Sequence, residues 1–580
     1  MSKVETPSLL DKLRFTKHVG PADHLVGAGL GTAYVVWLLA TVRNLGFARD
    51  EGTYFRAASD YGRWFKLLFE RPQLAFEQSS IDSAWQTNSE HPALMKSLFS
   101  LSWMFLHEKW KVFADASTAF RFPGMVMGGI GLWLVYVWGA RAYSRRAGVF
   151  AACGLALMPR VFYHSHLACF DVGIMTMWTA CVYVYWRAEQ KGGLAWAIFA
   201  GVMYGLTLET KHNAWILPAV FLGHAVVLHG RKFVRGARVG RLPLPASLIA
   251  MATIGPLVFV ALWPWLWNDT VPRFQNYARF HLNHEYYNME FLHVNYWKAP
   301  SPKGYMPVMI LATVPAVTLA LFVVGLGERA KLAWYRVRGL LAHVPFLASQ
   351  LRVSKGDGPK DRYETDLLLF LSFAAPVAVF LLPATPIFGG TKHWFPAYPF
   401  LCLFAGRGFD LVCGAMEKAM AARLTDDRKR LVATGAVLAM VTLGPLALTS
   451  HSHPFGLSAY TPLVGGTAGG ADLGLNRQFW GFTTQSLADY FEKNAPRGAT
   501  VFIHDTSWDA WGRMLDEKRI RPDLRGVGSI SEADFAIVHH ELHMAETDFN
   551  AWVGYGHVAP DFVLTHDGVP IVSVYRRSKH

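Results

Sequence analysis

The sequence predicts a polytopic α-helical membrane protein with a small α/β domain at its C-terminal end. Of its 580 residues, 52% are hydrophobic and only 17% are charged, whereas an ordinary soluble domain has about 25% charged residues. Apolar runs of about 15 to 22 residues, long enough to cross a membrane as helices, recur through the first three quarters of the chain. The remainder alternates short strand-like and helix-like segments.

About eleven of these apolar runs are predicted to cross the membrane, forming a transmembrane domain over residues 25–448. They cover residues 25–42, 125–140, 147–163, 172–186, 194–208, 214–228, 246–267, 306–326, 367–382, 394–413 and 431–448. The first run is not a cleavable signal peptide, because it begins late, is long and lacks a small-residue cleavage site.

Basic residues predict the orientation, because loops rich in Lys and Arg stay on the cytoplasmic side. They cluster in the N-terminal segment 1–24, in the loops after the second, sixth and eighth spans, and before the last span. An eleven-span count places all of these clusters on one side, with the N-terminus cytoplasmic. The net charge of +14 is then mostly topological, so no nucleic-acid partner is expected.

Three sizeable segments are left on the outer side, at residues 43–124, 268–305 and 449–580. The last segment is long enough for a small domain. Its strand-like runs are at 499–503, 535–538 and 571–575, and its helix-like stretches are near 507–519 and 547–552. We therefore expect a small extracytoplasmic α/β domain there.

Carboxylates stand at the outer ends of two predicted spans. Asp50 and Glu51 follow the first span, where one can act as a general base and the other as a hydrogen-bonding or metal-binding neighbour. Asp171 directly precedes the fourth span, at the same predicted depth. The alternative for each position is a carboxylate that caps a helix N-terminus. A divalent metal ion is compatible with the paired carboxylates, but nothing in the sequence requires a cofactor.

Cationic side chains are predicted on the same membrane face. Lys211 separates the fifth and sixth spans, and Lys392 and His393 precede the tenth. Lysine and histidine beside the outer leaflet can bind a lipid phosphate, although lysines that merely extend to the membrane surface are the alternative. Gathered on one face, these carboxylates and cations suggest a site that handles an anionic, lipid-linked substrate from outside.

Other polar residues are candidates for substrate binding on this face. They are Tyr54, Arg56, His91, Arg121, His166 and Arg279. The segment around Arg279 has the spacing of a helix that lies flat on the membrane surface, either as an anchor or as a cover over the substrate. His164 and His166 could indicate a metal, but alternate residues of a short loop point in different directions.

The order of these motifs along the chain resembles the protein O-mannosyltransferase and aminoarabinose transferase superfamily of GT-C glycosyltransferases. The matching motifs are Asp50-Glu51 with Tyr54, His91-Pro92, Arg121-Phe122-Pro123, Asp171, residues 208–212 and residues 392–399. The resemblance implies a GT-C fold. It also implies transfer of a sugar, with inversion, from a polyprenyl-phosphate donor to a hydroxyl acceptor on the outer face of the membrane. In a bacterium this is the inner membrane.

By this resemblance Asp50 matches the family's catalytic aspartate, which deprotonates the acceptor hydroxyl. Glu51 would position Asp50 or the acceptor, and Asp171 matches a second acidic residue that shapes the substrate site. Lys211 and the Lys392-His393 pair fall where cations of the family meet the donor phosphate, and cations there stabilise the leaving group.

Two departures leave the acceptor open, as protein, lipid or glycan. No outer segment can hold the large β-trefoil domain of the eukaryotic protein mannosyltransferases, and Ala93 stands where the family often has a further proline. A transporter or flippase of a polar lipid is the alternative function. It would need polar residues within several spans or inverted repeats, and the sequence shows neither. A structural subunit whose outer domain binds partners is a third hypothesis.

Overall fold

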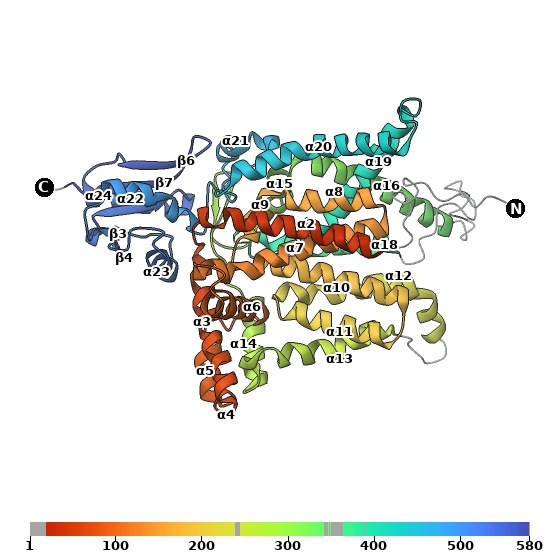
Figure 1. Cartoon of the computed structure of the whole chain (residues 1–580), viewed down its shortest axis with the longest axis horizontal. Coiled ribbons are helices and arrows are strands. Elements are labelled where there is room, and N and C mark those ends of the chain that lie inside the picture. Colours follow the sequence, from red (N-terminus) through yellow and green to blue (C-terminus); the bar gives the residue numbers. More distant parts are fainter. Residues whose placement is uncertain are drawn as a thin grey trace.

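The computed structural model describes residues 19–237, 244–341, 346, 349, 364–387 and 389–578. Part of the predicted basic N-terminal segment and of two predicted basic loops lies outside these residues. Helices form an elongated bundle, and a five-stranded sheet lies beyond one of its ends (Figure 1). This end of the bundle is called the sheet end below.

The structure has helices at all eleven predicted spans. The bundle helices are α2 (Pro21–Thr41), α7 (Ala116–Ala142), α8 (Arg145–Ala156), α9 (Pro159–Ser165), α10 (Asp171–Lys191), α11 (Leu194–Leu208), α12 (Leu217–Ala237), α13 (Ala246–Ala261), α15 (Tyr305–Thr313), α16 (Ala316–Leu341), α18 (Thr365–Ala378), α19 (Tyr398–Ala419) and α20 (Asp427–Ser452). The chain is an integral membrane protein. Among the described residues, five helices are long and apolar enough to cross a membrane, or up to seven if each of two bent pairs is one span. Eleven crossings therefore stay a prediction.

The basic turn between α7 and α8 lies at the opposite end of the bundle from the sheet (Figure 1). Its Arg145 donates a hydrogen bond from Nη2 to Asp23 Oδ2, 2.9 Å away at the start of α2. The beginning of α2 and this basic turn therefore share one end, as the predicted orientation requires.

Two pairs of consecutive helices meet at a bend. Helices α8 and α9 meet at 71°, and α15 and α16 meet at 116°. Pro159 begins α9; a proline suits this first position, because its fixed φ matches a helix and its missing N–H is not needed there. The bend places the polar side chains of α9 at the sheet end, inside the protein.

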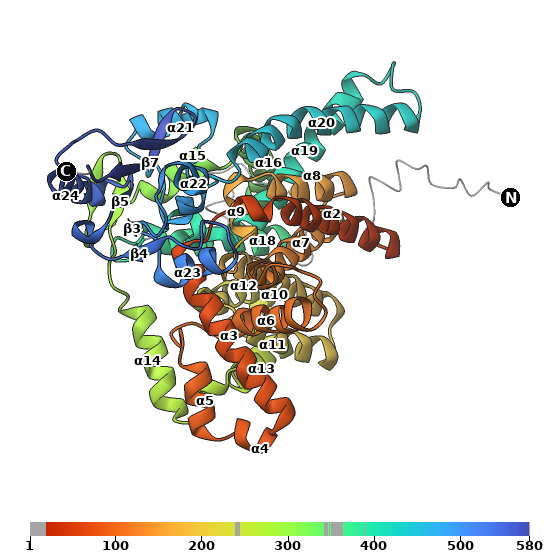
Figure 2. The same cartoon turned by 60° about the vertical axis from the view of Figure 1, so that its left-hand side comes forward.

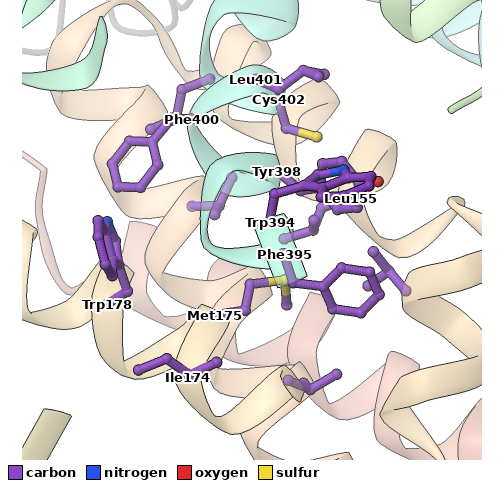
Figure 3. Close-up of a cluster of buried hydrophobic side chains, with 14 of the residues drawn as sticks. Leu155, Ile174, Met175, Trp178, Trp394, Phe395, Tyr398, Phe400, Leu401 and Cys402 are labelled. Atoms are coloured by element: carbon purple, nitrogen blue, oxygen red, sulfur yellow. The ribbon is translucent and has the colours of Figure 1, made fainter. Parts of the chain in front are cut away.

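A hydrophobic cluster fixes the segment that carries Lys392 and His393. This segment is the 3₁₀-helical η6 (Gly390–Ala397), which continues into α19. Trp394 and Phe395 are fully buried, and they lie with Met175 of α10 in the cluster shown in Figure 3. Because their side chains are enclosed, the neighbouring lysine and histidine are presented from a rigid backbone.

The first outer segment runs across the sheet end of the bundle (Figures 1 and 2). It forms α3 (Arg49–Glu70), α4 (Pro72–Ala75), α5 (Gln78–Trp85) and α6 (Leu94–Ser102). The second outer segment forms α14 (Thr270–Leu282) and the antiparallel hairpin of β1 (Met289–Phe291) and β2 (Val294–Tyr296). Helix α14 covers the stretch that was predicted to form a surface helix.

The C-terminal segment folds around the sheet, whose strand order is β4-β3-β5-β7-β6. Its elements are α21 (Gly466–Asp472), α22 (Ala488–Asn494), β3 (Thr500–Phe502), α23 (Trp508–Asp516), β4 (Arg525–Val527), β5 (Phe535–His539), α24 (Ala545–Tyr555), β6 (Phe562–His566) and β7 (Val569–Arg576). Strands β4, β3 and β5 are parallel, whereas β7 is antiparallel to both of its neighbours. Three strands fall in the three strand-like runs of the sequence.

The C-terminal segment packs directly on the sheet end of the bundle. The rings of Tyr163 in α9 and Phe482 have centroids 5.0 Å apart, and both belong to a hydrophobic cluster that includes Val501 of β3. Arg49 of α3 forms an ion pair with Asp505. The C-terminal segment therefore forms one wall of the space at this end of the bundle.

Candidate functional site

Two adjoining cavities lie where the bundle, the outer segments and the C-terminal segment meet. Their volumes are about 610 Å³ and about 350 Å³. The residues that line both cavities are Asp50, Tyr54, His91, His284, Lys392 and Trp480. The junction between the cavities is therefore formed by a carboxylate, an ammonium group and aromatic side chains.

The larger cavity has a polar wall that the C-terminal segment supplies. Residues 504–507 line it together with Glu541 and His543. Burial raises the pKa of Glu541 to about 8, so this side chain is mostly protonated at neutral pH. Its Oε1 accepts a hydrogen bond from Gln478 Nε2 at 2.9 Å. A protonated carboxyl group can donate as well as accept hydrogen bonds, which suits the recognition of a neutral polar group.

The smaller cavity is mainly apolar but has cations and a carboxylate on its wall. Its apolar lining includes Phe170, Trp215, Ile216, Leu282, Val379, Phe380 and Pro386. Asp171, Lys211 and His393 line this cavity and not the larger one. An apolar space that ends in charged groups fits a ligand with a hydrocarbon chain and an anionic head.

Asp50 lies at the junction because the first turn of α3, which contains it, borders both cavities. Its carboxylate is partly open, at 35% exposure, and Oδ2 is 3.8 Å from Lys392 Nζ. The same ammonium group lies 3.9 Å from the ring centroid of Trp480, a distance that allows a cation–π contact. Lys392 is thus held beside Asp50 without a tight hydrogen bond to it.

A second acid–base pair lies deeper, on the smaller cavity. Lys211 Nζ donates to Asp171 Oδ1 at 2.7 Å, and the other carboxylate oxygen is 3.1 Å from His164 Nδ1. Both Asp171 and His164 are buried. The carboxylate compensates the lysine, so Asp171 is more than a helix cap.

Glu51 lines neither cavity, and its predicted role of positioning Asp50 or the acceptor stays a prediction. Its carboxylate is fully buried and bonds to Arg121, with distances of 2.8 Å from Nε to Oε1 and 2.7 Å from Nη2 to Oε2. The backbone N–H groups of Ala48 and Ala168 also donate to it. Glu51 therefore caps α3 and ties this helix to the loop before Asp171. It positions Asp50 and Asp171 relative to each other.

Four predicted substrate-binding residues also lie outside the two cavities. Arg121 is occupied by Glu51 and by the carbonyl oxygens of residues 42, 45 and 46. His166 is buried and bonds to Thr41 Oγ1 and to the carbonyl of Phe162. Arg56 and Arg279 are exposed on the outer helices, where the solvent screens their charges. Tyr54 and His91, by contrast, line both cavities.

Arg160 lines the larger cavity but was not among the predicted site residues. It is only 1% exposed, and none of its three guanidinium nitrogens has a hydrogen-bond partner among the described residues. A signal for it existed in the sequence, since Arg160 interrupts the apolar run 147–163, and a charge within such a run is usually functional.

The paired carboxylates predicted as possible metal ligands do not converge. Both oxygens of Glu51 are used by arginine and backbone donors, so a metal ion would have to be held without this residue. Within the described part of the chain, three metal-ligating groups gather closely at His451, His566 and Asp567, outside both cavities. A divalent ion at Asp50 therefore stays a prediction.

Part of the chain matches a known protein family. Residues 101–260 match the model of a family described as dolichyl-phosphate-mannose-protein mannosyltransferase. This segment includes Arg121, Arg160, Asp171 and Lys211. A comparison with curated protein sequences found no match.

Comparison with solved structures found matches over most of this chain at low sequence identity. ArnT from Cupriavidus metallidurans, bound to undecaprenyl phosphate, is 13% identical, with 96% of this chain and 98% of that chain covered and a TM-score of 0.43. The oligosaccharyltransferase AglB from Archaeoglobus fulgidus, with an inhibitory peptide and a dolichol-phosphate, is 13% identical, covering 92% and 71%, at a TM-score of 0.45. Arabinosyltransferase EmbB from Mycobacterium smegmatis is 14% identical, covering 90% and 44%, at 0.37.

Proposed function

We propose that this chain is a GT-C glycosyltransferase, which moves a sugar from a polyprenyl-phosphate-linked donor to a hydroxyl acceptor on the extracytoplasmic face, with inversion at the anomeric carbon. The observation that carries the proposal is the junction of the two cavities, where Asp50 and Lys392 face each other at 3.8 Å. One cavity suits a lipid phosphate and the other a polar molecule. The groups that the reaction needs stand between them.

The donor occupies the smaller cavity in this proposal. Its apolar walls accommodate the isoprenoid segment next to the phosphate, and Lys392 and Lys211 lie at its charged end. The name of the matching family also specifies a lipid-phosphate sugar as the donor. The acceptor occupies the larger cavity, whose polar wall comes from the C-terminal segment.

The reaction is a single displacement. The acceptor oxygen attacks the anomeric carbon while its proton passes to the Asp50 carboxylate. The bond between the anomeric carbon and the phosphate oxygen breaks, and the polyprenyl phosphate leaves with the electron pair. Lys392 stabilises the negative charge that develops on this leaving group. One displacement without a covalent enzyme intermediate inverts the anomeric configuration.

The loose contact between Asp50 and Lys392 allows the donor phosphate to activate Asp50. Lys211 is engaged by Asp171 at 2.7 Å, whereas Lys392 is 3.8 Å from Asp50 and makes a weaker electrostatic contact. A donor phosphate in the smaller cavity competes for the Lys392 ammonium group. Asp50 then loses its counterion at the moment when the donor is present, which makes its carboxylate a stronger base.

The topology belongs to the same proposal. The N-terminus is cytoplasmic, and the cavities and the C-terminal domain face the outside of a bacterial inner membrane. The basic turn between α7 and α8 lies at the end of the bundle opposite the sheet (Figure 1), as this orientation requires. A single cysteine introduced near residue 146 should react with an impermeant thiol reagent only from the cytoplasmic side. One introduced near residue 556 should react only from the outer side.

The direct test replaces Asp50 with asparagine and measures sugar transfer from a polyprenyl-phosphate sugar in membranes. Loss of a general base should lower the rate by about 10²- to 10⁴-fold. Asp60→Asn is the matched control, because Asp60 lies on the same helix, bonds to Thr87 Oγ1 at 2.7 Å and lines neither cavity. An Asp50→Asn protein that folds and transfers sugar at the wild-type rate would contradict the assignment. Lipid movement across vesicles without transfer would favour a flippase.

A further inference from the structure

The larger cavity contains a cation that the proposed reaction does not use. Arg160 is almost wholly buried and lines this cavity at the start of α9. Its three nitrogens have no hydrogen-bond partner among the described residues. An arginine side chain stays charged in a protein. A buried charge without a partner is strongly unfavourable.

The other cations at this site differ from Arg160 because each of them has a carboxylate partner. Arg49 pairs with Asp505, Lys211 with Asp171 and Lys392 with Asp50. The buried Arg121 pairs with Glu51. Arg160 is therefore the cation lining the larger cavity for which the described residues provide no counterion.

Aromatic side chains surround the guanidinium group without neutralising it. Its carbon Cζ is 5.3 Å from the ring centroid of Tyr460, and Tyr305 lines the same wall of the cavity. The Tyr460 hydroxyl donates its proton to the carbonyl oxygen of Asn476 at 2.7 Å. The Tyr460 ring offers a cation–π contact, and its hydroxyl interacts with the guanidinium group, but a neutral tyrosine does not supply the negative charge that a buried cation requires.

We infer that Arg160 binds an anionic group, a phosphate or a carboxylate, of the substrate that fills the larger cavity. Under the proposed function, on which this inference rests, that substrate is the acceptor. An arginine offers two parallel N–H donors that match the oxygen pairs of phosphate and carboxylate groups. The acceptor thus carries a negative charge in addition to the hydroxyl group that Asp50 deprotonates.

Glu290 provides the structural alternative. This glutamate on β1 is buried, and its Oε1 has no hydrogen-bond partner among the described residues. A water-mediated pair between Glu290 and Arg160 would hold β1 against the bundle. The two roles predict opposite effects on stability, because removing an unpaired buried charge stabilises a protein whereas removing one partner of a pair destabilises it.

The experiment uses the full-length protein in nanodiscs. Binding of undecaprenyl phosphate to the wild-type protein is measured first, because its absence would count against the proposed donor site and not against the anion site. Thermal unfolding of wild type, Arg160→Met, Arg160→Lys and Glu290→Gln is then measured without this lipid and with the lipid saturating. Inorganic phosphate or acetate is titrated into the lipid-saturated samples. The two anions distinguish a phosphorylated acceptor from a carboxylated one.

The expected result is a higher unfolding temperature for Arg160→Met than for wild type in anion-free buffer. Phosphate or acetate should raise the unfolding temperature of wild type to a plateau, with an apparent affinity at least tenfold weaker in Arg160→Met and intermediate in Arg160→Lys. Three results would overturn the inference. In the first, Arg160→Met and Glu290→Gln lower the unfolding temperature by the same amount. In the second, phosphate or acetate raises the unfolding temperature of Arg160→Met as much as that of wild type. In the third, undecaprenyl phosphate stabilises wild type but not Arg160→Met.

Discussion

Replacement of Glu51 by glutamine separates the positioning role of this residue from a catalytic one. Each carboxylate oxygen of Glu51 accepts two hydrogen bonds, one from Arg121 and one from a backbone N–H group. A glutamine side chain has one oxygen and one NH₂ group. Whichever way the amide is turned, its NH₂ group faces two donors, so two of the four hydrogen bonds are lost.

The magnitude follows from these contacts. Hydrogen bonds to charged groups contribute about 1.5–3 kcal/mol each, and breaking a buried ion pair costs about 3–5 kcal/mol. These two figures overlap because they describe the same contacts, so we expect Glu51→Gln to lower the unfolding free energy by about 3–5 kcal/mol. Both side chains are fully buried, so solvent does not reduce this effect.

The assay is reversible unfolding in lipid bicelles, combined with sugar transfer by the fraction that remains folded. The neighbouring Asp50→Asn is the matched comparison. Asp50 is partly exposed and makes one ion contact at 3.8 Å, so its replacement should change the unfolding free energy by less than about 1 kcal/mol while removing activity. If Glu51→Gln is as stable as wild type and yet inactive, Glu51 takes part in the chemistry and the positioning role is wrong.

Three further predictions concern the donor, the pH dependence and the C-terminal domain. Lys392→Met should weaken the binding of a polyprenyl phosphate about tenfold or more, measured by lipid titration in nanodiscs, whereas unchanged affinity would place the phosphate elsewhere. Burial raises the pKa of Glu541 from its ordinary value of 4.5 to about 8, so over this range the folded state keeps a proton that the unfolded state releases, and stability falls as pH rises. Glu541→Gln should flatten this slope in unfolding temperatures between pH 5 and 8, and an unchanged slope would contradict it. In Gly52→Val, the new Cβ would lie 2.7 Å from the backbone nitrogen of Ala510; we expect the C-terminal segment to become sensitive to limited proteolysis, and wild-type resistance would refute the close packing of α3 on α23.

The arrangement of charges on one face could be predicted from the ends of the apolar runs. Asp50, Asp171, Lys211 and Lys392 are far apart in the chain, but each stands at the outer end of a predicted span. Residues at the same depth in a helical bundle are close in space, whatever their distance in sequence. Two ion pairs link these four residues in the structure.

The direction of each side chain could not be predicted in the same way. Asp50 and Glu51 are neighbours in sequence, yet successive residues of a helix point about 100° apart. Glu51 points into the protein, where it pairs with the fully buried Arg121. The role of Arg160 depends on the bend between α8 and α9; Pro159 within this apolar run marks a break in the helix, but it does not specify the cavity that Arg160 lines. Arg279 was predicted from its place in an outer segment, which does not specify the face of α14 on which it lies.

The assignment of the donor to the smaller cavity and of the acceptor to the larger one is tested most directly by a density map of the protein with a bound polyprenyl phosphate. The account predicts that the phosphate lies in the smaller cavity within hydrogen-bonding distance of Lys392 Nζ, with the first isoprene units along Trp215 and Phe380. It also predicts that Lys392 moves away from Asp50 when the phosphate is bound. A phosphate in the larger cavity beside Arg160, with the distance between Asp50 and Lys392 unchanged, would contradict both the donor site and the activation of Asp50.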